Sequence, residues 1–190
     1  MTVGAVRAGT PRAVPALQAL PFAAAIAGCV ALATRPVSPA FTAITIAVGL
    51  VGLLHPVARV DGDPAAARKI TWLASIALGV AAFGLARGML GGSLIPPPAA
   101  GIFAAGIAAG VAEEAFFRRL VYGSFLRWGA PAALAVSSVS FALVHVVVWG
   151  WRAVPVDLAA GVLLGWQRLV TGSWTAAAVT HAAANVVMLL

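Results

Sequence analysis

Long apolar runs separated by turn-forming residues constrain the fold of this chain more than any other sequence feature. A helix needs about 20 apolar residues to cross the hydrocarbon core of a bilayer. The breaks between the runs carry Gly, Pro and Asp-Gly pairs, which interrupt helices. Seven segments are predicted spans: Ala16–Thr34, Ser38–Val57, Ile70–Leu90, Ala99–Tyr122, Pro131–Trp149, Val154–Val170 and Trp174–Leu190.

Composition excludes the ordinary soluble classes of protein. Of the 190 residues, 62% are hydrophobic and 9% are charged, whereas soluble domains carry about 25% charged residues. The apolar runs are continuous and do not alternate with polar residues, so they predict helices and not the strands of a membrane barrel. We expect an all-α polytopic transmembrane helix bundle of about seven spans, within a range of about six to eight. Residues 1–190 then form a single integral membrane domain.

The fourth segment has a second interpretation. Residues 99–128 can form one long helix, whose second half is amphipathic and contains Arg118 and Arg119. That half is then expected to lie partly in the membrane interface.

Basic residues predict the orientation of the chain and its lipid contacts. The net charge is +7, and most cations flank apolar segments, where they meet anionic lipid headgroups. More of them fall on the side that holds Arg7 and Arg12, which predicts a cytoplasmic N-terminus. The Ala- and Arg-rich composition favours a bacterial plasma membrane. Nucleic-acid binding is not expected, because the chain lacks a basic stripe with interleaved aromatic residues.

Ionisable and amide side chains inside the apolar runs are the strongest functional signal. Each ionisable group at the membrane centre costs about 2.5–3.5 kcal/mol, so such groups normally face the bundle interior and serve a function. Glu113 and Glu114 fall in the fourth segment and His145 in the fifth, while His181 and Asn185 lie one helical turn apart in the last.

Turn positions place these side chains at one depth. Glu113 lies 16 residues before Gly129, and His145 lies 16 residues after it. A hairpin at Gly129 therefore brings the two side chains level if both helices are regular. His181 and Asn185 follow the turn at Gly172 by 9 and 13 residues, which gives a similar depth. Three helices thus bring a carboxylate, two imidazoles and an amide together.

Other polar and small residues have structural interpretations. Glu114 and Arg118, at i and i+4, are read as a structural ion pair. Asp157 suits a helix N-terminus and is given no catalytic role, and His55 is read as interfacial. The tryptophans near segment ends form an aromatic belt: Trp128, Trp149, Trp151 and Trp174. Several glycines mark faces where helices of this chain approach closely: Gly101, Gly106, Gly110, Gly161 and Gly165.

Three ordered motifs carry a family resemblance. Glu113 to Arg118 reads EExxxR, Phe141 to His145 reads FxxxH, and His181 to Asn185 reads HxxxN. Together they resemble the CPBP family of intramembrane proteases, also called Abi, which includes type II CAAX prenyl endopeptidases and bacteriocin-processing proteins. The resemblance covers residues 99–190. Residues 1–98 are expected to be scaffold helices, and 99–190 the catalytic core.

The resemblance implies peptide-bond hydrolysis within the membrane. Glu113 would activate a water with the help of His145, while His181 and Asn185 would stabilise the oxyanion. The same resemblance assigns a supporting role to three more residues: Glu114, Arg118 and Phe141. The implied substrate is a peptide or a lipidated protein.

Two questions stay open at the level of sequence. Glu113, His145 and His181 would also suit a zinc site with an open position, but no HExxH motif is present, and we favour a mechanism without metal. A self-immunity or binding protein on the same fold would carry the same residues. A proton-coupled transporter would use intramembrane Glu and His chains, although no inverted repeat is visible.

Overall fold

The computed structural model describes residues 39–55, 65–90 and 100–189, and these form helices joined by short turns. The predicted span Ala16–Thr34 lies outside the described residues. The helices longer than one turn are α2 (Pro39–Leu54), α3 (Ala65–Leu90), α4 (Ala100–Glu114), a π-helix (Ala115–Val121), α6 (Ala130–Trp149), α7 (Val154–Thr171) and α8 (Trp174–Leu189). The short helix α5 (Tyr122–Phe125) and two 3₁₀ turns complete the set.

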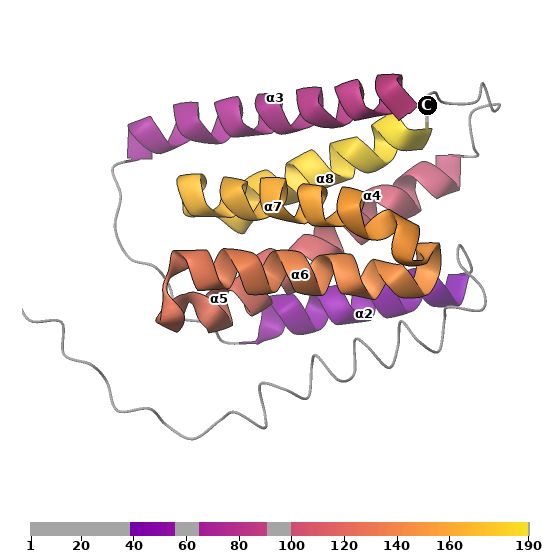
Figure 1. Cartoon of the computed structure of the whole chain (residues 1–190), viewed down its shortest axis with the longest axis horizontal. Coiled ribbons are helices and arrows are strands. Elements are labelled where there is room, and N and C mark those ends of the chain that lie inside the picture. The colour runs from indigo at the N-terminus through magenta and orange to yellow at the C-terminus, as the bar shows by residue number, and fades with distance from the viewer. Residues whose placement is uncertain (1–38, 56–64, 91–99, 190) are drawn as a thin grey trace, which may run out of the picture.

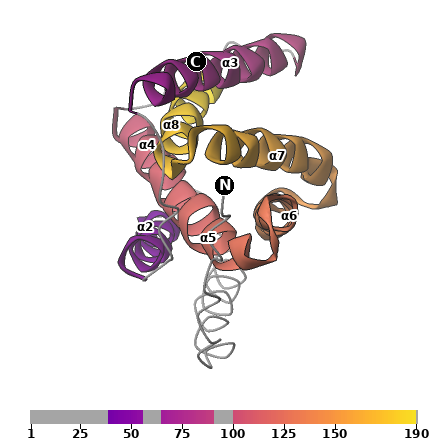
Figure 2. The same ribbon diagram turned by 90° about the vertical axis from the view of Figure 1, so that its left-hand side faces the viewer.

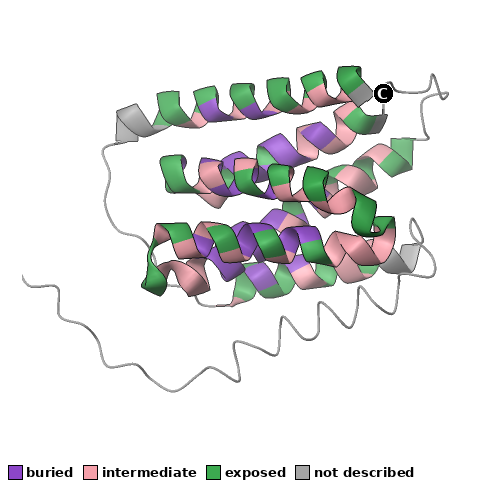
Figure 3. Cartoon of the chain, viewed as in Figure 1, coloured by how far each residue is buried: buried purple, intermediate pink, exposed green. Residues whose placement is uncertain are grey.

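The bundle is built around α4 and α8, which cross in close contact. Helices α6 and α7 form an antiparallel hairpin beside them, and α2 and α3 flank opposite sides, α2 against α4 and α3 against α8 (Figures 1 and 2). Buried residues gather where these helices face one another, whereas the outer faces of α2 and α3 are largely exposed (Figure 3). An apolar outer face is what contact with lipid tails requires.

Length and hydropathy identify four described segments able to cross a membrane: Lys69–Met89, Ala100–Trp128, Ala130–Trp149 and Trp151–Thr171. Helices α2 and α8 have 16 residues each, which at 1.5 Å per residue is about 24 Å. That is shorter than the roughly 30 Å hydrocarbon core. The all-helical fold is therefore confirmed for the described residues, while the expected seven spans are not.

The fourth span is longer than the segment Ala99–Tyr122 and agrees with the second interpretation, one long helix over residues 99–128, but its form was not predicted. Helical structure continues from Ala100 to Trp128 without a break, and Ala115–Val121 is a π-helix. Most of this π-helix is buried against the other helices, so the segment packs inside the bundle and does not lie along its surface. That this amphipathic stretch lies partly in the membrane interface stays a prediction, while two of its cations, Arg118 and Arg119, donate to backbone carbonyls inside the protein.

Two of the predicted small-residue contacts bring helix backbones together. A Cβ added to Gly161 would lie 3.0 Å from the Ser138 carbonyl oxygen, which shows how closely α7 approaches α6. One added to Gly110 would lie 3.0 Å from the Ala182 backbone nitrogen, between α4 and α8. Gly101 has no such neighbour within 4 Å among the described residues, so close packing there stays a prediction.

A buried amide joins α3, α7 and α8. Gln167 is fully buried, and its Nε2 donates to the Ser75 carbonyl at 2.7 Å and to the Thr180 hydroxyl at 2.9 Å. Gly79 lies against the same group, because a Cβ there would be 2.5 Å from Gln167 Nε2 and 2.6 Å from Thr180 Cγ2. These hydrogen bonds hold α8 against α3 at Thr180, the residue that precedes His181.

We expect Gly79→Ala to lower the stability of the bundle by about 1–3 kcal/mol, the usual cost of overpacking a tight contact. Gly84→Ala is the matched control on the same helix, since a Cβ there meets nothing within 4 Å. That variant should be neutral or more stable by up to about 1 kcal/mol, from helix propensity. Thermal unfolding in detergent micelles measures both. Equal midpoints for the two variants would contradict the packing described.

Candidate active site

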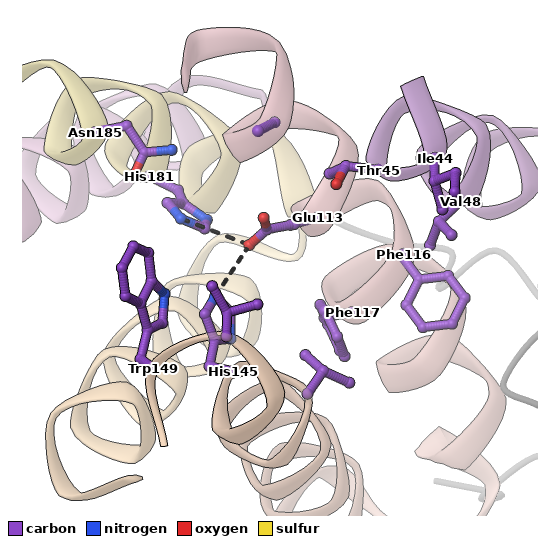
Figure 4. Close-up of a pocket in the computed structure, with 13 residues that line it drawn as sticks. Ile44, Thr45, Val48, Glu113, Phe116, Phe117, His145, Trp149, His181 and Asn185 are labelled. Carbon is purple, nitrogen blue, oxygen red and sulfur yellow. Dashed lines mark ion pairs between the residues drawn. The ribbon is translucent and has the colours of Figure 1, made fainter. Parts of the chain in front are cut away.

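Glu113 lies at the centre of the site, in the last turn of α4. Its Oε2 is 3.7 Å from His145 Nε2 and 3.8 Å from His181 Nε2 (Figure 4). The same oxygen is buried and has no hydrogen-bond partner among the described residues. Distances above 3.5 Å are too long for direct hydrogen bonds. One carboxylate and two imidazoles, from α4, α6 and α8, thus converge on a small space between them.

His145 is oriented by the backbone of its own helix. Its Nδ1 lies 2.8 Å from the Phe141 carbonyl oxygen. A carbonyl only accepts hydrogen bonds, so Nδ1 carries the proton and donates. In the neutral imidazole, Nε2 is then the acceptor, and this is the atom that faces Glu113. The FxxxH spacing therefore sets both the tautomer and the direction of the ring.

His181 is oriented by Glu114. Its Nδ1 lies 2.8 Å from Glu114 Oε1, and Arg118 Nη1 donates to the same oxygen at 3.1 Å. Arg118 Nη2 also donates to the Gly161 carbonyl at 3.0 Å. The side chains of Glu114 and Arg118 have no exposed surface. The expected ion pair is present, and it also turns His181 so that Nε2 points toward Glu113.

Phe141 packs between the charged and imidazole groups. Its ring centroid lies 4.5 Å from that of His145 and 5.7 Å from that of His181. The Arg118 guanidinium carbon lies 4.5 Å from the same centroid, within the range of a cation–π contact. The side chain of Phe141 therefore fixes the faces of both imidazoles, while its carbonyl holds His145.

Asn185 lies one helical turn beyond His181, as the spacing predicts. Its Nδ2 donates to the Gly106 carbonyl of α4 at 2.9 Å, and the side chain lines the cavity beside His181 (Figure 4). Gly110 permits this contact, because a Cβ there would be 3.2 Å from the Asn185 amide nitrogen. Glu113, His145 and His181 thus form the centre, and Asn185 forms an adjoining part of the wall.

A cavity of about 250 Å³ opens onto these groups. Its remaining walls are mostly apolar and come from α2, α4, the π-helix and α6: Ile44, Thr45, Val48, Ala109, Phe116, Phe117, Val144, Val148 and Trp149. Trp149 is 62% exposed, so the cavity reaches the surface at the end of α6.

Sequence reasoning missed three features of this site. Trp149, read as part of an aromatic belt, also lines the cavity; its place one turn after His145 is a signal that could have shown this. The contribution of α2 carries no motif. Asp157 has a buried Oδ2 without a hydrogen-bond partner among the described residues, and its charge acts on His145, Glu113 and His181. Asp157 therefore belongs to the electrostatic surroundings of the site.

The donor types at the centre are among those that bind zinc, and two of their separations are slightly wider than those around tetrahedral zinc. Tetrahedral zinc with bonds of about 2.0–2.2 Å holds its ligand atoms about 3.4 Å apart. Here the separations from Glu113 Oε2 are 3.7 and 3.8 Å. No group of three or more His, Cys, Asp or Glu within the described residues has an arrangement suited to a metal ion.

A carboxylate and two histidines thus lie together among apolar helices. In a comparison with known families, residues 95–187 match the family described as Type II CAAX prenyl endopeptidase Rce1-like. All three motifs fall within this segment. The chain is thus similar to this family over residues 95–187, and the predicted resemblance is confirmed. The family match and the four long apolar helices together support an integral membrane protein. No curated protein and no solved structure matches the chain.

We expect Arg118→Met to destabilise the protein by about 3–5 kcal/mol, because it leaves the Glu114 charge buried without its cation. The double variant Glu114→Gln/Arg118→Met removes both charges and should lose less folding stability than Arg118→Met alone. Thermal unfolding of both variants and of wild type measures the difference. A double variant less stable than Arg118→Met would contradict the charge pairing.

Proposed function

We propose that this chain is an intramembrane endopeptidase that hydrolyses a peptide bond with a water activated by Glu113. One observation carries the proposal: the buried Oε2 of Glu113 has no hydrogen-bond partner among the described residues and borders the cavity, 3.7 Å from His145 Nε2 and 3.8 Å from His181 Nε2. The family match supports the protease class and a substrate of the CAAX type.

In the proposed reaction, a water lies between Glu113 Oε2 and His145 Nε2. Both atoms accept hydrogen bonds, and a water has two hydrogens to donate, so it satisfies both. Glu113 takes one proton as the water oxygen attacks the carbonyl carbon of the substrate. Collapse of the tetrahedral intermediate breaks the C–N bond, and the proton passes to the leaving nitrogen. The products are a carboxylic acid and an amine, and transfer of the acid's proton to the amine gives a carboxylate and an ammonium group.

His181 and Asn185 are the proposed oxyanion donors. In this mechanism His181 carries protons on both ring nitrogens, with Nδ1 bonded to Glu114 and Nε2 facing the cavity. That protonation makes the charges of His181, Arg118, Glu113 and Glu114 sum to zero. Asn185 has a second amide hydrogen besides the one it gives to Gly106. Donors held in place before reaction stabilise developing negative charge most effectively.

The first prediction for this function concerns the base. Glu113→Gln keeps the shape of the side chain but cannot take a proton, so cleavage should fall by about 10²–10⁴-fold. Purified protein in lipid vesicles is incubated with prenylated CAAX peptides and leader peptides, and products are identified by mass spectrometry.

Val139→Ala is the control for this variant, since Val139 is exposed on α6 away from the cavity. It should cleave as wild type does. Equal cleavage by Glu113→Gln and wild type would refute the role of Glu113. Binding of these peptides without cleavage by wild type would favour a binding protein over a protease.

The second prediction concerns metal. Because the proposed attack needs only a water held by Glu113 and His145, cleavage should survive extended treatment with a strong chelator. Metal analysis of the active protein should find zinc far below one ion per chain. Loss of activity that returns with added zinc would overturn the proposal of a water activated by Glu113 alone.

A further inference from the structure

Helix α2 lies outside the segment that matches the protease family, yet it forms one wall of the cavity. Ile44, Thr45 and Val48 all line it, on the side of Glu113 away from His181 and Trp149 (Figure 4). These three positions lie on one face of the helix. Ile46 and Leu50, on the opposite face, are exposed.

The backbone of α2 is in direct contact with the catalytic helix. A Cβ added to Gly49 would lie 2.5 Å from Ala112 Cα, and one added to Gly52 would lie 2.5 Å from the Ala115 carbonyl carbon. Real Cβ atoms do not approach other atoms so closely. The two glycines therefore let α2 pack against the residues on either side of Glu113, which fixes the distance between this wall and the carboxylate.

Arg119 holds the C-terminal end of the same helix. Its Nη1 donates to the carbonyls of Gly52 and His55, the latter at 3.0 Å. The last carbonyls of a helix lack intrahelical partners and carry partial negative charge, so a cation there is favourable. Arg118 and Arg119 thus serve different parts of the structure: Arg118 supports the catalytic groups, and Arg119 fastens α2.

We propose that α2 is the specificity wall of the protease, and that the substrate side chain next to the scissile bond lies against Ile44, Thr45 and Val48. This inference rests on the proposed function. The wall is aliphatic apart from one hydroxyl, and the whole cavity is about 250 Å³. It therefore suits an apolar side chain of moderate size, and Val48 limits how large that side chain can be.

The test compares Val48→Ala with Leu50→Ala, a control that shortens an exposed side chain of the same helix. Both are given a mixture of peptides that differ only in the residue following the scissile bond. Val48→Ala should shift the ratio of kcat/KM toward larger apolar residues by about 10-fold, the effect typical of one or two methylene groups in a pocket. Leu50→Ala should keep the wild-type ratio. The same preference in both variants would overturn the proposal.

A second measurement does not depend on cleavage. The inactive Glu113→Gln protein is photo-crosslinked to a peptide that carries a diazirine on that side chain, and the attachment sites are mapped by mass spectrometry. Attachment to residues 44–48 supports the wall, and attachment confined to α6 or α8 overturns it. Wild type that cleaves no peptide would refute the protease proposal. If crosslinks still form on α2, the assignment of α2 as a wall of the binding cavity stands.

Discussion

The site depends on one buried carboxylate that two cationic or hydrogen-donating groups share. Glu114 Oε1 accepts from both Arg118 and His181, in surroundings with no exposed surface. An unpaired charge there would be costly, so the three groups hold one another in place. Arg118 extends the network to the Gly161 carbonyl, which ties α4 and α8 to the hairpin of α6 and α7. The orientation of His181 toward Glu113 follows from this network.

The π-helix that follows Glu114 makes neighbouring side chains point to different parts of the bundle. Its wider turns change the register after α4, and such segments often occur at functional sites. Glu113 then lines the cavity, Arg118 binds inside the bundle, and Arg119 reaches the end of α2. Phe116 and Phe117 pack edge to face within the same segment, and both line the cavity. Residues 113–119 thus supply the proposed base, the ion pair beside it and part of the cavity wall.

Spacing in the sequence predicted the centre of the site because helices and hairpins have regular dimensions. Glu113 and His145 are the same number of residues from Gly129, which predicted that they lie at one depth. Gly129 does lie at the turn before α6, with a positive φ of 96°. The i and i+4 spacing gave the contact of Glu114 with Arg118. The π-helix was not predicted, because no Gly or Pro within Ala115–Val121 marks it. The contact of α2 with α4 and the π-helix was not predicted either, because it depends on tertiary packing at Gly49 and Gly52.

The central claim is that a water, and not a protein side chain, attacks the peptide bond. Single-turnover cleavage in water enriched in oxygen-18 tests it most directly, with enzyme in excess over a cleavable peptide. The account predicts one oxygen-18 atom in the new carboxylate of the first product, and no covalent adduct on Glu113. Product without the label in the first turnover, with its oxygen supplied by the protein, would contradict it.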